Sequence, residues 1–71
     1  MAWKVVSANR FMHGGKAIER YELVNGNREA LMTYDGSMYF VATNWGKPSN
    51  YTLDRIIEVV EEYRRTRGWV R

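Results

Sequence analysis

The sequence predicts a small α+β fold, in which an antiparallel β-meander of three or four strands packs one face against a single C-terminal amphipathic helix (ββββα). Two turn signals, Asn25-Gly26-Asn27 and Asp35-Gly36, separate runs of β-type residues at short intervals, which favours a meander. Further along the chain, apolar residues recur at helical spacing between positions 53 and 63. The 71 residues are enough for one domain, residues 1–71, with one small core.

Four runs rich in β-forming residues are the predicted strands: residues 2–8, 17–24, 28–34 and 37–43. Residues 9–16 are predicted to be a connection, in which Gly14 and Gly15 are free to take positive φ angles. The sequence leaves open whether the first strand joins the edge of the meander or swaps into a neighbouring chain.

The lengths of the two later turns, two residues at 35–36 and three residues at 25–27, predict which side chains face the helix. They place Leu31 opposite both Tyr21 and Phe40. The predicted core face then carries Ala17, Tyr21, Leu23, Leu31, Met38, Phe40 and Ala42. This register also leaves Glu19 and Glu29 on the core face, where they must sit at an edge or reach solvent.

The opposite face of the predicted sheet is also apolar. It carries Ile18, Val24, Ala30, Met32, Tyr34, Tyr39 and Val41, among the charged residues Arg20, Glu22 and Arg28. One helix covers only one face of a sheet, and this second face is more apolar than a solvated face needs to be. We therefore expect it to be a docking surface.

Residues 52–67 are the predicted helix, because their apolar residues form one stripe and their last turn is rich in arginine. The stripe consists of Leu53, Ile56, Ile57, Val60 and Tyr63. The candidate N-cap residues are Ser49, Asn50 and Thr52. Gly68 suits the C′ position of a Schellman motif, which would let Trp69 pack on Tyr63.

The composition excludes several classes of site. The chain has no Cys and only one His, so it has no disulfide, no thiolate metal site and no histidine pair for a metal. The segment 13–16 (HGGK) lacks the spacing of a phosphate-binding P-loop, and no nucleophile and base stand at a recognisable spacing. No apolar run approaches the ~20 residues that span a bilayer, and the N-terminus is too short and polar for a signal peptide. We expect a cytoplasmic, non-enzymatic protein with no cofactor and no membrane partner.

The loop before the helix carries Trp45, a large apolar residue for a loop position. Trp45 either folds back as a lid on the core or is held out as an anchor, since Trp is enriched at interface hot spots. Lys47 and its polar neighbours would then form the rim of the contact. The predicted partner-binding residues are Trp45, Lys47, Tyr34, Tyr39 and Met32.

The surplus of large amphipathic side chains predicts a small binding protein that acts on another protein as an inhibitor or adaptor, of the kind that phages and other mobile elements carry. A homodimer is a further way to bury apolar area that a small monomer leaves exposed. The alternative is a nucleic-acid-binding module, although a net charge of +3 does not by itself indicate one. Its candidate residues are Arg64, Arg65, Arg67, Trp69 and Arg71, together with the aromatic sheet face.

Overall fold

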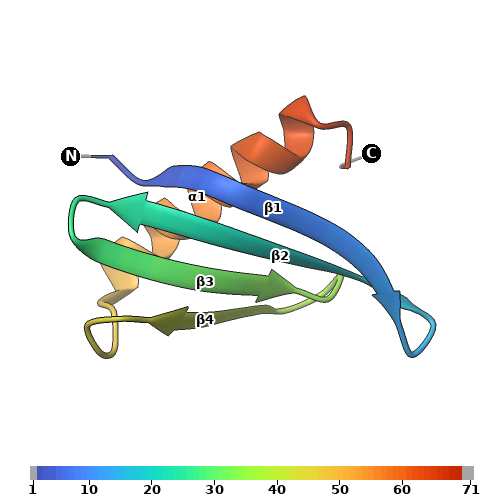
Figure 1. Cartoon of the computed structure of the whole chain (residues 1–71), viewed down its shortest axis with the longest axis horizontal. Helices are drawn as coiled ribbons and strands as arrows, with labels where there is room; N and C mark the ends of the chain where they lie inside the picture. The colour runs from blue at the N-terminus through green and yellow to red at the C-terminus, as the bar shows by residue number, and fades with distance from the viewer. Residues whose placement is uncertain (1, 70–71) are drawn as a thin grey trace.

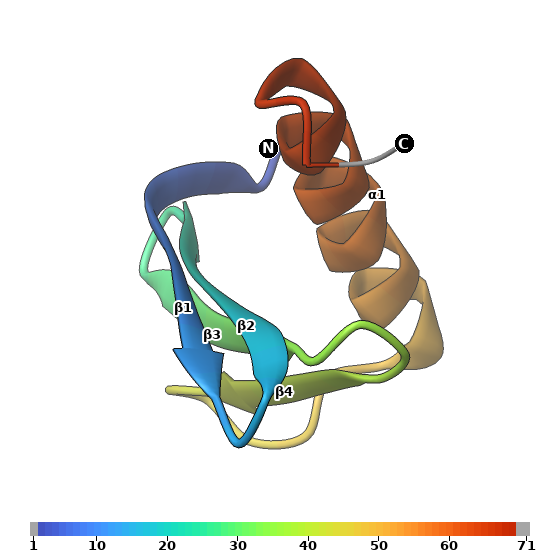
Figure 2. The same cartoon turned by 90° about the vertical axis from the view of Figure 1, so that its right-hand side faces the viewer.

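The computed structural model describes residues 2–69, which form four β-strands followed by one α-helix. In chain order these are β1 (Lys4–His13), β2 (Lys16–Asn25), β3 (Arg28–Tyr34), β4 (Tyr39–Thr43) and α1 (Asn50–Thr66). The strands form one antiparallel sheet in the order β1-β2-β3-β4, and α1 crosses one of its faces (Figure 1, Figure 2). The predicted ββββα fold is confirmed, and β1 joins the meander at its edge.

The β1–β2 hairpin is longer than the sequence predicts, because β1 continues to His13 instead of ending at residue 8. Gly14 and Gly15 form a two-residue turn with φ angles of 58° and 78°, which other residues rarely adopt. Because this turn is so short, the ladder extends to the pair formed by His13 and Lys16. The predicted connection is therefore wrong in its first part, and the hairpin projects beyond the other strands (Figure 1).

The turn between β2 and β3 is one residue shorter than predicted. It contains only Gly26 and Asn27, so that Asn25 pairs with Arg28. Gly26 has a φ of 64°, and two-residue hairpin turns require a positive φ at their first central position. The prediction of a three-residue loop is therefore wrong, and the register of the two strands shifts by one residue.

This shift exchanges the two predicted faces of β3, because successive side chains point to opposite sides of a strand. Met32, and not Leu31, lies opposite Tyr21 and is fully buried. The buried hydrophobic core consists of Tyr21, Leu23, Ala30, Met32, Ile56 and Val60. The observed register also moves Glu29 to the solvent side, which removes a carboxylate from the core face.

The predicted core face is correspondingly wrong at four positions, whose side chains are exposed. These are Leu31, Met38, Phe40 and Ala42. The residues expected on the uncovered face include five that face the helix instead: Ala30, Met32, Tyr34, Tyr39 and Val41. The general expectation that one helix leaves one apolar face uncovered still holds, but different residues form that face.

The connection between β3 and β4 contains four residues, 35–38, instead of the predicted two. Asp35 shapes it, because its Oδ1 accepts hydrogen bonds from the backbone N–H groups of Met38 (2.8 Å) and Ser37 (3.0 Å). These two bonds hold the pKa of Asp35 below its ordinary value. Two extra residues shift the register by an even number, so each side chain of β4 stays on the same face of the sheet, relative to β3, as predicted.

Helix α1 begins at Asn50, two residues before the predicted start. Of the three candidate N-caps, Ser49 takes the role, and its Oγ accepts a hydrogen bond from the backbone N–H of Thr52 at 3.2 Å. The preceding Pro48 cannot donate a backbone hydrogen bond, which suits a residue just outside the helix.

The C-terminal end of α1 forms the predicted Schellman motif. Gly68 has a φ of 74°, and its backbone N–H donates to the carbonyl of Arg65 at 3.2 Å. The backbone N–H of Trp69 donates to the carbonyl of Arg64 at 2.9 Å. The Trp69 ring then packs edge-on against Tyr63, with the ring centroids 6.3 Å apart, so this prediction is confirmed.

Candidate functional site

Three of the predicted partner-binding residues, Met32, Tyr34 and Tyr39, lie on the side of the sheet that α1 covers. Met32 is fully buried, so it offers no surface to a partner and is removed from the predicted partner-binding residues. Tyr34 and Tyr39 are half-buried and stack on each other, with their ring centroids 4.5 Å apart. The expectation that these three residues form an uncovered face is wrong.

Both tyrosines are tied to their surroundings by specific contacts. The Tyr39 hydroxyl donates a hydrogen bond to Glu61 of α1, and the Tyr34 hydroxyl donates to the carbonyl of Gly36 at 2.9 Å. Burial, together with the hydrogen bond to Glu61, raises the pKa of Tyr39 above its ordinary value of 10.0. The guanidinium of Arg64 lies 4.5 Å from the centroid of the Tyr34 ring, as in a cation–π contact. These contacts fasten the β3–β4 hairpin to the helix.

The Trp45 ring folds back toward the core. It is half-buried and stacks on Trp3, with the ring centroids 5.6 Å apart. The guanidinium of Arg28 lies 5.1 Å from the centroid of the Trp45 ring. Trp45 thus makes the contacts expected of a lid, whereas Lys47 beside it is exposed.

Two of the C-terminal arginines make contacts on the surface of the helix. Arg65 Nη2 lies 2.5 Å from Glu62 Oε1, and the guanidinium of Arg67 lies 4.9 Å from the centroid of the Tyr63 ring. Both arginine side chains remain exposed, and such surface contacts contribute little to folding stability. Arg71, the last residue of the predicted nucleic-acid cluster, lies outside the described residues.

Arg64, by contrast, forms a largely buried ion pair with Glu19 of β2. Arg64 Nε lies 2.6 Å from Glu19 Oε1, and the Glu19 side chain is only 3% exposed. Glu19 also accepts a hydrogen bond from the Tyr21 hydroxyl and lies 3.6 Å from Arg10 Nε. Burial and the bond to Glu19 raise the pKa of Tyr21. The guanidinium of Arg10 in turn lies over the Trp69 ring, at 5.5 Å from its centroid.

This cluster resolves the difficulty that the sequence poses at Glu19. Its carboxylate stays on the core face, as predicted, but it reaches neither an edge nor solvent. Instead, α1 supplies Arg64 as its counter-ion, because a buried charge needs a partner of opposite sign. Arg64 and Trp69 are therefore part of the packing between the helix and the sheet.

The uncovered side of the sheet, opposite α1, carries a separate apolar surface, which we call the open face. It is formed by Val6, Val24, Leu31, Phe40 and Ala42. Val6, Leu31 and Phe40 are 53%, 38% and 52% exposed, and Leu31 lies directly beside Ala42 in the β3–β4 ladder. Contiguous apolar area of this kind marks interaction sites more often than isolated exposed residues do.

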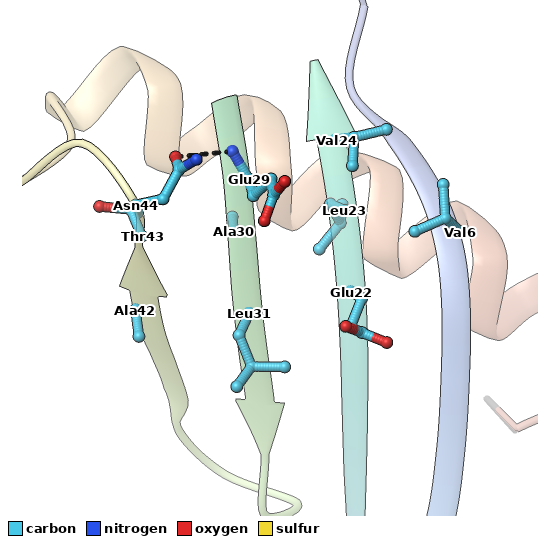
Figure 3. A pocket seen from close by; sticks show the side chains of 10 residues that line it. All are labelled: Val6, Glu22, Leu23, Val24, Glu29, Ala30, Leu31, Ala42, Thr43 and Asn44. Carbon is cyan, nitrogen blue, oxygen red and sulfur yellow. Dashed lines mark hydrogen bonds between the residues drawn. The ribbon is translucent and has the colours of Figure 1, made fainter. Parts of the chain in front are cut away.

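A shallow groove of about 450 Å³ runs across the open face. Figure 3 shows Val6, Glu22 and Leu31 lying in front of three neighbouring strands, with α1 behind the sheet. Among the residues that line this groove, the charged ones are Glu22 and Glu29. The groove therefore combines apolar walls with negative charge, although the whole chain carries a net charge of +3.

Sequence reasoning missed the open face because it assigned Leu31 and Phe40 to the core. One signal could have found it, because residues two apart on a strand share a face. Glu29 therefore lies on the same side as Leu31, and an unpaired carboxylate there argues for solvent. The sequence gives no such signal for Val6, because its side chain becomes exposed through the bulge between Val5 and Ser7.

Within residues 2–69, no group of three or more His, Cys, Asp or Glu side chains is placed to hold a metal ion. The helix of this described region is also not long and apolar enough to cross a membrane. Comparisons of the chain with protein-family models, with curated protein sequences and with solved structures gave no significant match.

Proposed function

We propose that this chain is a binding protein that recognises another protein through the open face. One observation carries the proposal: Val6, Leu31 and Phe40 remain exposed on a sheet whose other face is packed by α1 (Figure 2). Val6 and Leu31 line the groove, and exposed apolar side chains of this kind form a surface on which a few contacts dominate binding. The partner would place an apolar side chain in the groove.

The charge of the groove favours a partner with basic residues beside that apolar side chain. Glu22 and Glu29 line the groove, and lysine or arginine on the partner would complement them. A nucleic-acid strand is disfavoured at the same place, because its phosphates would meet two carboxylates. Of the C-terminal arginines, Arg64 adds little support for nucleic-acid binding, since it already neutralises Glu19.

The test compares partner capture by the full chain and by a variant of the open face. The variant Leu31→Lys/Phe40→Lys removes both apolar contacts and adds positive charge beside the acidic groove. The matched control is Met12→Lys, which makes the same kind of change at a residue that is 69% exposed on β1 and lies outside the groove. Each immobilised protein is exposed to lysate of the source organism, and a retained polypeptide is identified, purified and titrated.

We expect the wild type and Met12→Lys to bind the purified partner equally, and Leu31→Lys/Phe40→Lys to bind it at least about tenfold more weakly. Circular dichroism must show that all three proteins are folded. Equal binding by the three proteins would place the contact elsewhere on the chain. Salt-sensitive retention of DNA or RNA by the wild type would instead favour the nucleic-acid alternative.

A further inference from the structure

We propose that β4 is a self-association edge, along which the β4 strands of two copies of this chain pair antiparallel and join their sheets into one. This inference goes beyond the proposed function, because it concerns the backbone edge of β4 and not the side chains of the open face. β4 is the last strand of the sheet, and its outer side borders no other strand among the described residues (Figure 1).

The hydrogen bonds at the two ends of β4 show which backbone groups point outward. Asn44 N–H donates to the carbonyl of Glu29 at 3.1 Å, and Asp35 N–H donates to the carbonyl of Met38 at 3.3 Å. Met38 and Asn44 therefore occupy hydrogen-bonded positions of the β3–β4 ladder. In an antiparallel ladder such positions recur at every second residue. The even-numbered residues of β4 therefore direct their backbone N–H and C=O groups toward β3.

The odd-numbered residues Tyr39, Val41 and Thr43 therefore direct their N–H and C=O groups away from β3, toward the free edge. A partner strand would satisfy these groups without breaking any bond within the chain. The five-residue strand also has its centre at Val41, one of the outward-facing residues. A two-fold axis at Val41 brings Tyr39 opposite Thr43 of the second copy, and pairs the strand over its whole length.

The two edges of the sheet differ in how they are protected against such pairing. β1 carries Lys4 and Arg10 and has a bulge between Val5 and Ser7, which are features that discourage edge-to-edge contact. By contrast, the segment 36–46, which contains β4, has no charged residue and no proline. The ladder between β3 and β4 also runs without a register shift. Natural proteins rarely leave an edge in this state unless it is paired.

The occupant that fits this edge is a second copy of the chain. Two chains with a net charge of +3 repel each other, and they repel least where an uncharged segment meets its own copy. Pairing about Val41 also sets Phe40 beside Ala42 of the second copy, which makes the two open faces continuous. One short strand pair buries less surface than the roughly 800 Å² per partner of a typical stable interface. The fraction of the chain that is dimeric should therefore depend on its concentration.

The first test removes the outward backbone donor at the proposed axis and leaves every side chain unchanged. A synthetic full-length chain carries an N-methyl group on Val41, and the control carries it on Met12. By the alternation that starts at the Gly14-Gly15 turn, the N–H of Met12 faces the free edge of β1. Sedimentation equilibrium then follows the molecular mass of each chain from micromolar to millimolar concentration.

For the wild type and the Met12 control, we expect the mass to rise from 8.4 kDa toward twice this value as concentration increases. N-methylation of Val41 should raise the dissociation constant of the dimer at least about tenfold, because two hydrogen bonds at the axis are lost. A wild type that stays monomeric at millimolar concentration overturns the proposal. So does a dimer that N-methylation of Val41 leaves intact.

The second test reports the register and uses the absence of native cysteine. In Phe40→Cys/Ala42→Cys, the proposed pairing brings the cysteines of two copies directly opposite each other, within disulfide range. The matched control Ser7→Cys/Asn9→Cys has the same spacing on the same side of the sheet, but on β1. Mild oxidation should give covalent dimers of the first variant and far fewer of the second. Equal cross-linking of the two variants would contradict pairing through β4.

Discussion

Arg64 of α1 and Glu19 of β2 form an ion pair between residues that are 45 positions apart in the chain, with 2.6 Å between Arg64 Nε and Glu19 Oε1. The carboxylate is 3% exposed and the arginine side chain 11% exposed. Water therefore screens this pair much less than it screens the surface pairs of the helix. The pair joins the C-terminal end of α1 to the second strand of the sheet.

Replacing Arg64 with Met should lower the free energy of unfolding by about 3 kcal/mol, because it leaves Glu19 buried without its main cation. Urea unfolding followed by circular dichroism measures this change. The control Arg65→Met removes an exposed partner of Glu62 and should leave the midpoint almost unchanged. The double variant Glu19→Gln/Arg64→Met should recover part of the loss, because no buried charge then remains unpaired. Equal effects of the two single variants would show that the buried pair contributes no more to folding stability than the exposed pair of Arg65 and Glu62.

The observed register predicts opposite outcomes at two neighbouring positions of β3. Leu31→Lys should change the free energy of unfolding by less than about 1 kcal/mol, because Leu31 lies on the open face. Met32→Lys should cost more than about 3 kcal/mol or prevent folding, because it places an ammonium group in the core. Urea unfolding and one-dimensional NMR spectra distinguish the two. The register predicted from the sequence requires the opposite result, in which Leu31→Lys causes the larger loss of stability.

The stacking of Trp45 on Trp3 should be visible as an energetic coupling. Trp45→Ala should lower the free energy of unfolding by about 2 kcal/mol, since the ring is half-buried against the core. A double-mutant cycle with Trp3→Ala should give a coupling of about 1 kcal/mol. The control cycle combines Trp3→Ala with Phe40→Ala, a residue of the open face, and should give additive changes. A cycle without coupling between Trp3 and Trp45 would show that the stack contributes nothing to folding.

Stability should fall as the pH rises above 10.0, the ordinary pKa of a tyrosine hydroxyl. Burial and hydrogen bonds to carboxylates raise the pKa of Tyr21 and Tyr39 in the folded state. Above 10.0 the unfolded chain therefore releases protons that the folded chain keeps, which favours unfolding. The contribution is complete below 10.0 and is lost progressively above it. Urea unfolding from neutral pH to beyond 10.0 measures the slope.

The variant Tyr39→Phe removes one of the two groups and should make this alkaline loss of stability less steep. Ultraviolet absorbance of tyrosinate provides an independent readout, because the buried hydroxyls should ionise only as the protein unfolds. If all five tyrosines ionise together near 10.0 in the folded protein, the proposed contacts of Tyr21 and Tyr39 are absent.

The elements of this fold could be predicted because their signals are local. Turn residues delimit β3 at its predicted bounds, and the Gly68-Trp69 ending of α1 has the geometry that its sequence indicates. The register was not predictable in the same way, because the segment 25–27 allows turns of more than one length. The choice between them depends on the φ of Gly26 and on whether Leu31 or Met32 is buried.

The existence of an uncovered apolar face could be predicted from the sequence, but the residues that form it could not. One helix and a sheet with two apolar faces leave one face uncovered, and this holds for either register. A shift of one residue, however, moves every side chain of a strand to the other face, so Met32 and Leu31 exchange roles. The pairing of Glu19 was also hidden, because nothing in the sequence separates Arg64 from its arginine neighbours before the helix is placed.

The strand order has a consequence for how fast the chain folds. Each strand pairs with its neighbour in sequence, so the sheet can assemble by closing three short loops. Only the packing of α1 against the sheet must close long stretches of chain, such as the one between Glu19 and Arg64, which makes the docking of the helix the slow event in loop closure. If this docking is the rate-limiting step and forms the pair of Arg64 with Glu19, loss of the Arg64 side chain will slow refolding and leave the unfolding rate almost unchanged.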